Sequence, residues 1–266
     1  MIIYIILFFL LGCILSDIFI NIGYRLPIKE NVFVNRKCIK CKSEFTLVDK
    51  IPIIGYIKNK GKCPKCNEKL YKHYFLFMIF TGLIYALCFY LLHDKEPNII
   101  YLFYSLVFVS TLLIVIVSDF KYMLILNEVL ISSSVLLILL KLYIDYYNEE
   151  IVNFMDFGYN IIFMFINFIL IYIFMSIIKK IGDYIFKNES MGSGDVKLMS
   201  VIAIILGYKM SIVVIFIGAF IALPFSVYNM IKNNNNMFPF GPFLSIASII
   251  LFLFSIDFDI ILNFIN

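Results

Sequence analysis

Long apolar segments constrain this chain more than any other feature of its sequence. A helix that crosses a bilayer needs ~20 mainly apolar residues. Of the 266 residues 62% are hydrophobic and only 15% are charged, and the mean hydropathy is +0.97, far from the averages of soluble proteins. The sequence therefore predicts an all-α polytopic membrane protein, embedded in a lipid bilayer, with about eight transmembrane helices at 1–23, 74–93, 98–118, 123–143, 157–178, 195–207, 210–231 and 239–262.

The segment 195–207 is shorter than a membrane span requires. Its uninterrupted apolar part, Leu198 to Leu206, is about half of the ~20 residues that a span needs. We expect this segment to tilt, to lie beside a thinned bilayer, or to begin as non-helical backbone that other parts of the protein cover. The first segment, 1–23, has no basic residue before its apolar stretch, so it is interpreted as a retained helix and not as a signal peptide.

The distribution of basic residues predicts the orientation. The loop that follows the first helix holds thirteen of the 22 Lys and Arg residues. Under an eight-span topology nineteen of the 22 lie on one face, with only Lys95, Lys141 and Lys209 opposite. Because basic loops stay in the cytoplasm, we expect the large loop to be cytoplasmic and both termini to be outside. Asp119 and Asp195 then both lie at the cytoplasmic boundary.

Four cysteines in the large loop form two CxxC pairs at the spacing of a zinc ribbon. The pairs are Cys38 with Cys41 and Cys63 with Cys66. Four thiolates at this spacing favour a closed, tetrahedral, structural Zn²⁺ site, with two disulfides as the alternative. The predicted domains are a first transmembrane helix at 1–23, a cytoplasmic zinc-ribbon-like insert at 24–73, and a transmembrane core at 74–266.

Two aspartates stand where an apolar chain tolerates charge poorly. Asp119 closes a long apolar run, and Asp195 ends the tetrad Gly192-Ser193-Gly194-Asp195. An ionised side chain at the centre of a membrane helix costs roughly 2.5 to 3.5 kcal/mol, which makes such acids functional candidates. Glycines beside Asp195 suit a backbone that must approach a substrate closely. Lys197 is a candidate for orienting Asp195 or the substrate, against the alternative of an interfacial lysine.

Two close carboxylates suit peptide hydrolysis. One takes a proton from water while the other, protonated, polarises the scissile carbonyl, and like charges held close share a single proton. The same residues also fit structural roles. Asp119 could end a helix and pair with a lysine, and Asp195 could be a helix N-cap. Asp17 in the first helix is a rival intramembrane acid. An ion- or proton-coupled transporter and a non-catalytic zinc-binding scaffold are the alternative classes of protein.

Five motifs, in order, resemble those of the type IV prepilin peptidases, membrane aspartyl proteases with a GxGD motif. They begin at Tyr24, Asp49, Ser118, Gly192 and Pro239, and read YRLP, DKIPIIGY, SDFK, GSGDVKL and PFGPF. The sequence departs from the family pattern at Ser16-Asp17, after Asp119 where Ile125-Leu126-Asn127 lacks a proline, and at Tyr74–Met78.

The resemblance implies an aspartic endopeptidase of the bacterial cytoplasmic membrane, with Asp119 and Asp195 as catalytic residues. Its partner would be a prepilin or pseudopilin precursor, cut on the cytoplasmic side between a basic leader and a hydrophobic helix. No nucleic-acid partner is expected. Many family members also N-methylate the new terminus with S-adenosylmethionine. No Gly-rich cofactor loop is visible in the sequence, so this second activity is left open and no residue is assigned to it.

Overall fold

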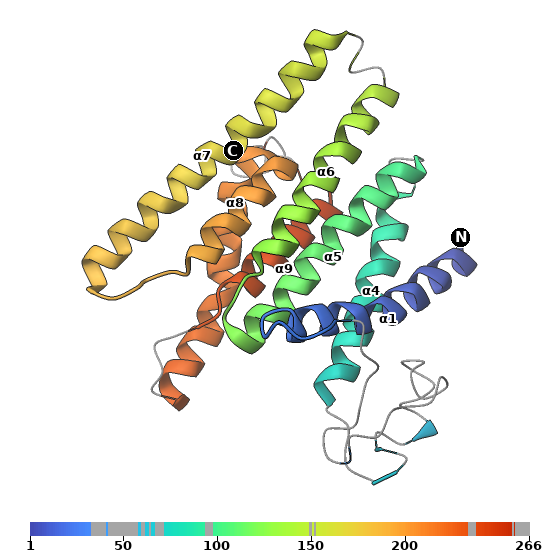
Figure 1. Ribbon diagram of the computed structural model, residues 1–266, viewed down its shortest axis with the longest axis vertical. Helices are drawn as coiled ribbons and strands as arrows, with labels where there is room; N and C mark the ends of the chain where they lie inside the picture. The colour runs from blue at the N-terminus through green and yellow to red at the C-terminus, as the bar shows by residue number, and fades with distance from the viewer. Residues whose placement is uncertain are drawn as a thin grey trace. The chain divides into compact units, whose positions relative to one another are not determined.

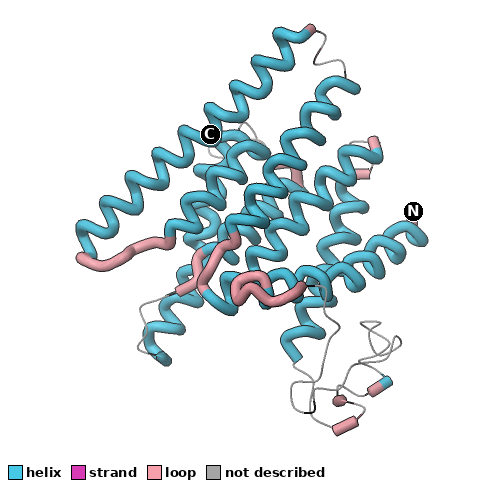
Figure 2. Tube along the Cα trace, in the orientation of Figure 1, coloured by secondary structure: helices cyan, strands magenta, loops and turns pink. Residues whose placement is uncertain are grey.

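The computed structural model describes residues 1–32, 41, 58–59, 62–63, 65–66, 72–93, 98–148, 151, 153–233, 238–256 and 258. The elements of these described residues are α-helices joined by loops (Figures 1 and 2). A helical fold suits a membrane, because each helix pairs its own backbone N–H and C=O groups, to which lipid cannot hydrogen-bond. The chain forms two compact units, Met1–Lys95 and Glu96–Asn266, which are described separately.

The first unit is built on two packed helices, α1 (Ile2–Arg25) and α4 (Lys72–Leu92). Two glycines allow them to approach closely. A Cβ atom at Gly12 would lie 2.8 Å from the carbonyl oxygen of Thr81, and one at Gly82 would lie 2.7 Å from Cys13 Sγ. Helices in lipid associate through such small residues, which bring the two backbones together.

The described residues of the second unit form five helices (Figure 1). Helix α8 packs against three others, α6, α7 and α9, and α5 packs against α6 and α9. The short helix α9 is therefore in contact with both α5 and α8. The bounds of the five helices are Ile99–Tyr122 (α5), Asn127–Tyr147 (α6), Phe154–Phe186 (α7), Ser193–Asn233 (α8) and Gly241–Leu253 (α9).

Six of the described helices are long and apolar enough to cross a membrane, which confirms the helical membrane fold. The expected number was about eight, and the difference has two causes. The predicted spans 195–207 and 210–231 are consecutive parts of α8, and the predicted span 239–262 contains α9, whose 13 residues are too few for a full crossing. The zinc-ribbon-like insert lies mostly outside the described residues, so the boundaries at 24 and 73 stay predictions.

Gly207 interrupts α8. Its φ of 78° and ψ of 164° are not helical, and this backbone region is open essentially to glycine alone. The chain changes direction here, so α8 consists of a shorter part that begins at Ser193 and a longer part that ends at Asn233 (Figure 1). The break falls at the end of the segment that the sequence marked as too short for a span. The shorter part carries Asp195 at its first turn.

Small side chains bring α9 close to α8. A Cβ at Gly218 of α8 would lie 3.0 Å from the Leu244 side chain of α9, and Ser245, Ala247 and Ser248 of α9 are fully buried. Ser248 bonds to its own helix, since its hydroxyl donates to the carbonyl of Leu244. This close packing holds α9 against α8 from Leu244 onward, and the N-terminal end of α9 reaches the candidate site.

Candidate active site

Asp119 lies in the last turn of α5 and is buried, with 5% of its surface exposed. The helix ends one turn later at Met123, whose left-handed conformation (φ 52°, ψ 42°) lets its N–H donate to the Asp119 carbonyl at 2.9 Å. Such a closure is common at helix C-termini, although the residue is more often glycine. It turns the chain within a few residues, so Ile125 returns to the region of Asp119 before α6 begins.

Asp195 lies in the first turn of α8 and is also buried, with 7% exposed. The helix starts at Ser193, so Asp195 is its third residue and not the N-cap that one interpretation of the sequence proposed. Its N–H donates to the Gly192 carbonyl at 3.2 Å. A carboxylate near a helix N-terminus is favoured by the helix dipole, so this position suits an ionisable acid that other residues shield from water.

The two aspartates, 76 positions apart in the sequence, belong to one site. The contacts of Ile125 and Gly241 join the segments that carry them. The side chain of Ile125 lies between the flanking segments, because its Cδ1 is 3.3 Å from where a Cβ of Gly194 would be and 3.1 Å from where a Cβ of Gly241 would be. The end of α5 and the starts of α6, α8 and α9 therefore converge on the two acids.

Gly241, the first residue of α9, contacts Asp119 directly. Its backbone N–H donates to Asp119 Oδ2 at 3.0 Å in a buried hydrogen bond. Sequence reasoning did not assign this residue to the site, although the PFGPF motif contains it. The available signal was Gly-Pro at a helix start, since proline is favoured in the first turn and glycine permits a close approach.

Each glycine of the GSGD tetrad has a neighbour that leaves little room for a side chain. A Cβ at Gly194 would lie 2.9 Å from Ile125 Cβ, closer than carbon atoms approach without movement. A Cβ at Gly192 would lie 3.2 Å from Asp195 Oδ2. The predicted supporting role of these glycines thus has a steric basis: Gly194 lets α8 approach Ile125, and Gly192 leaves space for the carboxylate.

Lys197 lies on the exposed side of α8 and bonds to α6. Its Nζ donates to the side-chain oxygen of Asn127 at 3.0 Å. The contact ties the first turn of α8 to the first turn of α6, two residues beyond Ile125. Among the described residues the hydrogen-bond partner of Lys197 is Asn127 and not Asp195, so a role in orienting Asp195 would be indirect.

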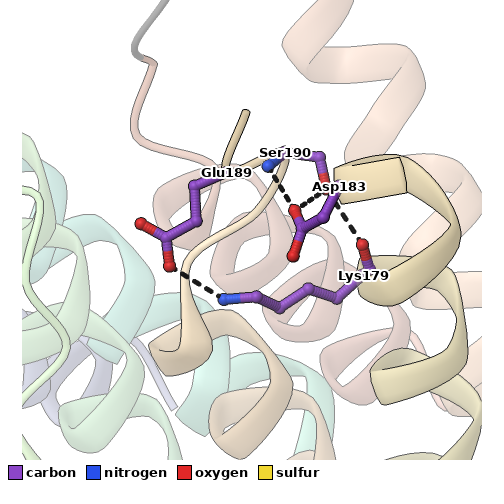
Figure 3. A network of polar contacts seen from close by, with 4 residues as sticks. All are labelled: Lys179, Asp183, Glu189 and Ser190. Atoms are coloured by element: carbon purple, nitrogen blue, oxygen red, sulfur yellow. Dashed lines mark hydrogen bonds and ion pairs between the residues drawn. The ribbon is translucent and has the colours of Figure 1, made fainter. Parts of the chain in front are cut away.

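The loop before the tetrad is held against the end of α7 by a polar network (Figure 3). The Ser190 N–H and hydroxyl both donate to Asp183 Oδ1, at 2.6 and 2.8 Å, and the hydroxyl also lies 3.2 Å from the Lys179 carbonyl. Lys179 Nζ forms an ion pair with Glu189 at 3.1 Å. Because Ser190 is two residues before Gly192, the network fixes the approach of the chain to Asp195.

Three of the four predicted metal-binding cysteines lie together. The sulfur atoms of Cys41, Cys63 and Cys66 are all within 4.8 Å of one another, and those of Cys41 and Cys63 are 3.8 Å apart. Four ligands around zinc at ~2.3 Å have edges of about 3.8 Å in tetrahedral geometry. The cluster therefore suits a metal ion. Cys38, the fourth predicted ligand, lies outside the described residues.

Two other acids were considered or overlooked as candidates. Asp17 of α1 is half-buried and belongs to the first unit, whereas Asp119 and Asp195 belong to the second. Asp145 of α6, which sequence reasoning did not consider, is 3% exposed and pairs with Lys141 at 2.7 Å. The i, i+4 spacing of this lysine and aspartate was the signal that could have found the pair.

Comparison with known proteins covers nearly the whole chain. Residues 10–92 match the bacterial peptidase A24 N-terminal domain, and residues 106–227 match the type IV leader peptidase family. Curated relatives include two named prepilin leader peptidase/N-methyltransferase. One, from Bacillus subtilis (strain 168), is 26% identical and matches over 96% of this chain and 95% of its own. The other, from Vibrio cholerae serotype O1, is 28% identical over 94% and 96%.

A third relative of the same name, from Dichelobacter nodosus, is 25% identical over 82% of this chain and 70% of its own. No solved structure gave a significant match. The two matched regions of this chain are the N-terminal domain and the peptidase part of a single family, in the same order as the two compact units. The chain is therefore a member of the type IV leader peptidase family, the A24 peptidases.

Proposed function

We propose that this chain is an aspartic endopeptidase that removes the basic leader from type IV prepilin-like precursors, with Asp119 and Asp195 as its acid and base. The observation that carries the proposal is the convergence of two buried carboxylates, at the end of α5 and the start of α8, around Ile125 and Gly241. Family membership and the names of the relatives give the class of substrate. They favour a peptidase over the transporter and the scaffold that sequence alone left open.

The chemistry follows from the pair of acids. The ionised carboxylate takes a proton from water while the water oxygen bonds to the scissile carbonyl carbon, and the protonated carboxyl donates to the carbonyl oxygen. When the tetrahedral intermediate collapses, the C–N bond breaks and the leaving nitrogen accepts a proton. The products are a leader with a free carboxylate and a mature protein with a new amino terminus. Because the two acids titrate as a pair, the roles of acid and base are assigned to the pair and not to one aspartate each.

The proposed membrane topology would bring the scissile bond of the precursor to the two aspartates. The basic residues favour a cytoplasmic face for the loop after α1, with both termini outside. A precursor with its basic leader in the cytoplasm and its apolar helix in the bilayer would then present the scissile bond at the depth of Asp119 and Asp195. The orientation can be tested by labelling single cysteines, introduced at exposed loop positions, with a membrane-impermeant reagent in intact cells.

The test of the function uses the purified full-length chain and a precursor with an intact leader. Wild type should release the leader, and Asp119→Asn and Asp195→Asn should each lower the rate by more than about 10³-fold, a loss within the range of acid–base catalysis. Asp145→Asn is the matched control, because Asp145 is another buried aspartate of the same unit. Cleavage at the wild-type rate by either site variant would exclude the proposed mechanism.

We also propose N-methylation of the new terminus, because relatives named for both activities match over at least 94% of this chain. No described residue is assigned to S-adenosylmethionine. Labelled methyl transfer from S-adenosylmethionine to a synthetic mature N-terminus tests this activity without cleavage. Asp119→Asn should retain it, since methyl transfer to a free amine does not need the hydrolytic pair.

The cysteine cluster is proposed to hold a structural Zn²⁺ with Cys38 as the fourth ligand. Four thiolates leave no coordination position for water, so the ion would stabilise the loop and take no part in hydrolysis. Metal analysis of the purified protein should give one zinc per chain. The zinc should be lost in Cys63→Ser and retained in Cys88→Ser, the control, since Cys88 is fully buried in α4. Unchanged zinc in Cys63→Ser would refute the site.

A further inference from the structure

We propose that Gly241 is a positioning residue of the peptidase: the N-terminal end of α9 holds the Asp119 carboxylate in place through its first backbone N–H. This inference rests on the proposed function of Asp119 and extends it to a helix 122 residues away along the chain. The direct observation is the buried hydrogen bond of 3.0 Å from the Gly241 N–H to Asp119 Oδ2.

Asp119 depends on this bond because few other groups hold its side chain. Within the described part of the chain it has no ion pair, and Gly241 is the donor that bonds to its carboxylate. The free N–H groups at a helix N-terminus and the helix dipole both favour a carboxylate. The α9 end therefore fixes one oxygen of Asp119, and the charge of that oxygen helps to seat α9.

Glycine is required at 241 for a steric reason. A Cβ there would lie 2.8 Å from Asp119 Oδ2 and 3.4 Å from its Cγ, and 3.1 Å from Ile125 Cδ1. A separation of 2.8 Å between a methyl carbon and a carboxylate oxygen forces one of them to move. The backbone of α9 is constrained by Pro242 and by packing on α5 and α8, so the Asp119 side chain is the part that yields.

The expected result of Gly241→Ala is thus a displaced catalytic group in a folded protein. A displacement of ~1 Å in an active site can cost about 10²-fold in rate. We expect kcat for precursor cleavage to fall about 30- to 100-fold. KM should change less than about threefold, because the residues that bind the rest of the precursor are untouched.

Two variants separate positioning from packing. Gly218→Ala adds a methyl group to a different contact of α9, 3.0 Å from the Leu244 side chain and with neither aspartate within 4 Å among its three nearest atoms. Its kcat should stay within about threefold of wild type. Ile125→Val removes the Cδ1 atom that the methyl group added by Gly241→Ala would touch, but it leaves the conflict with Asp119. Combining the two substitutions should therefore not restore activity. Equal losses in both glycine variants, or rescue by Ile125→Val, would overturn the proposal.

The hydrogen bond can be observed without any activity assay. Labelling with carbonyl-¹³C phenylalanine and ¹⁵N glycine selects Phe-Gly pairs, and this chain has only two, ending at Gly158 and Gly241. Gly158→Ala assigns them, and nothing lies within 4 Å of a Cβ at that position. Asp119→Asn should move the Gly241 amide proton upfield, because a neutral acceptor replaces a charged one, and leave Gly158 unchanged.

The outcomes distinguish this inference from the function on which it rests. If Asp119→Asn is inactive and Gly241→Ala cleaves at the wild-type rate, the positioning role is wrong and the proposed function stands. If Asp119→Asn is active, the proposed function fails first. If Gly241→Ala does not fold, the amide proton shift of Gly241 in the otherwise wild-type chain is the test. A shift that Asp119→Asn leaves unchanged would overturn the positioning role.

Discussion

Buried carboxylates lie near both ends of α6, and the protein accommodates them differently. Asp145, close to the C-terminal end, is paired at 2.7 Å with Lys141 of the same helix. Asp119 and Asp195 lie near the N-terminal end of α6, which is about 27 Å from Asp145 along the helix at 1.5 Å per residue. Neither of these two aspartates has an ion pair among the described residues. Asp119 is held by a backbone N–H instead. A charge neutralised by its own helix is structural, whereas acids held only by backbone groups stay available to exchange protons.

The largest expected effect concerns the two unpaired acids. If Asp119 and Asp195 act as one unit, the double variant Asp119→Asn/Asp195→Asn should cleave no more slowly than either single variant, all at least about 10³-fold below wild type. Single-turnover assays on the purified chain measure this. Losses that multiply in the double variant would show that the two acids act independently.

Gly194→Ala tests whether the approach of α8 to Ile125 matters to the pair. The added methyl group would meet Ile125 Cβ at 2.9 Å, so the first turn of α8 must shift and carry Asp195 with it. We expect a fall in kcat of about 10- to 100-fold. Gly158→Ala, where the methyl group meets nothing within 4 Å, should leave kcat unchanged. A similar fall in kcat there would show that any glycine-to-alanine change in these helices lowers activity.

Lys141→Met tests the paired acid. It leaves the Asp145 carboxylate buried without its cation, which should lower the free energy of unfolding by about 1–3 kcal/mol. The kcat of the folded enzyme should not change. Thermal unfolding in detergent measures the loss, and Lys141→Met/Asp145→Leu should recover most of it because both charges are then removed. A large fall in kcat would show that Asp145 takes part in catalysis. The distinction between a structural Asp145 and a catalytic Asp119 and Asp195 would then be wrong.

The smallest effect is expected at the loop before the tetrad. Ser190→Ala removes the hydroxyl contacts of Ser190 with Asp183 and Lys179 but keeps its backbone bond to Asp183. A net loss of about 1 kcal/mol in holding the loop corresponds to about a fivefold fall in kcat. Ser190→Thr keeps the hydroxyl and should retain more activity than Ser190→Ala. Equal rates for the two variants would show that the network does not act on Asp195.

Much of the helical fold was predictable because membrane helices follow from local composition. The apolar runs located the described helices, and the predicted boundary between 195–207 and 210–231 falls at the interruption at Gly207. The segment 195–207 does not begin as non-helical backbone, which was one expectation, because α8 is helical from Ser193. The number of spans was harder to predict, because a glycine can bend a continuous helix or end it. That α9 is too short for a crossing did have a signal, because Asp257 and Asp259 interrupt the apolar residues of the predicted segment 239–262.

The candidate site was predictable only in part. Asp119 and Asp195 stand out because acids are costly in an apolar chain, and basic residues placed them on one face. The contacts of Gly241 and Ile125 depend on which helices pack together, and side chains that all prefer lipid give no local signal of this pairing. Asp145 was overlooked because a nearby lysine makes it resemble an ordinary surface charge.

The break at Gly207 has a consequence for the surrounding lipid. The part of α8 before it, Ser193 to Leu206, is about 21 Å long, against ~30 Å for the hydrocarbon layer. Lys209 follows almost at once, so the far end of the helix that begins beside Asp195 reaches a charged group well before the opposite surface. Where lipid meets this end we expect the bilayer to thin, and long acyl chains should then slow this enzyme more than short ones.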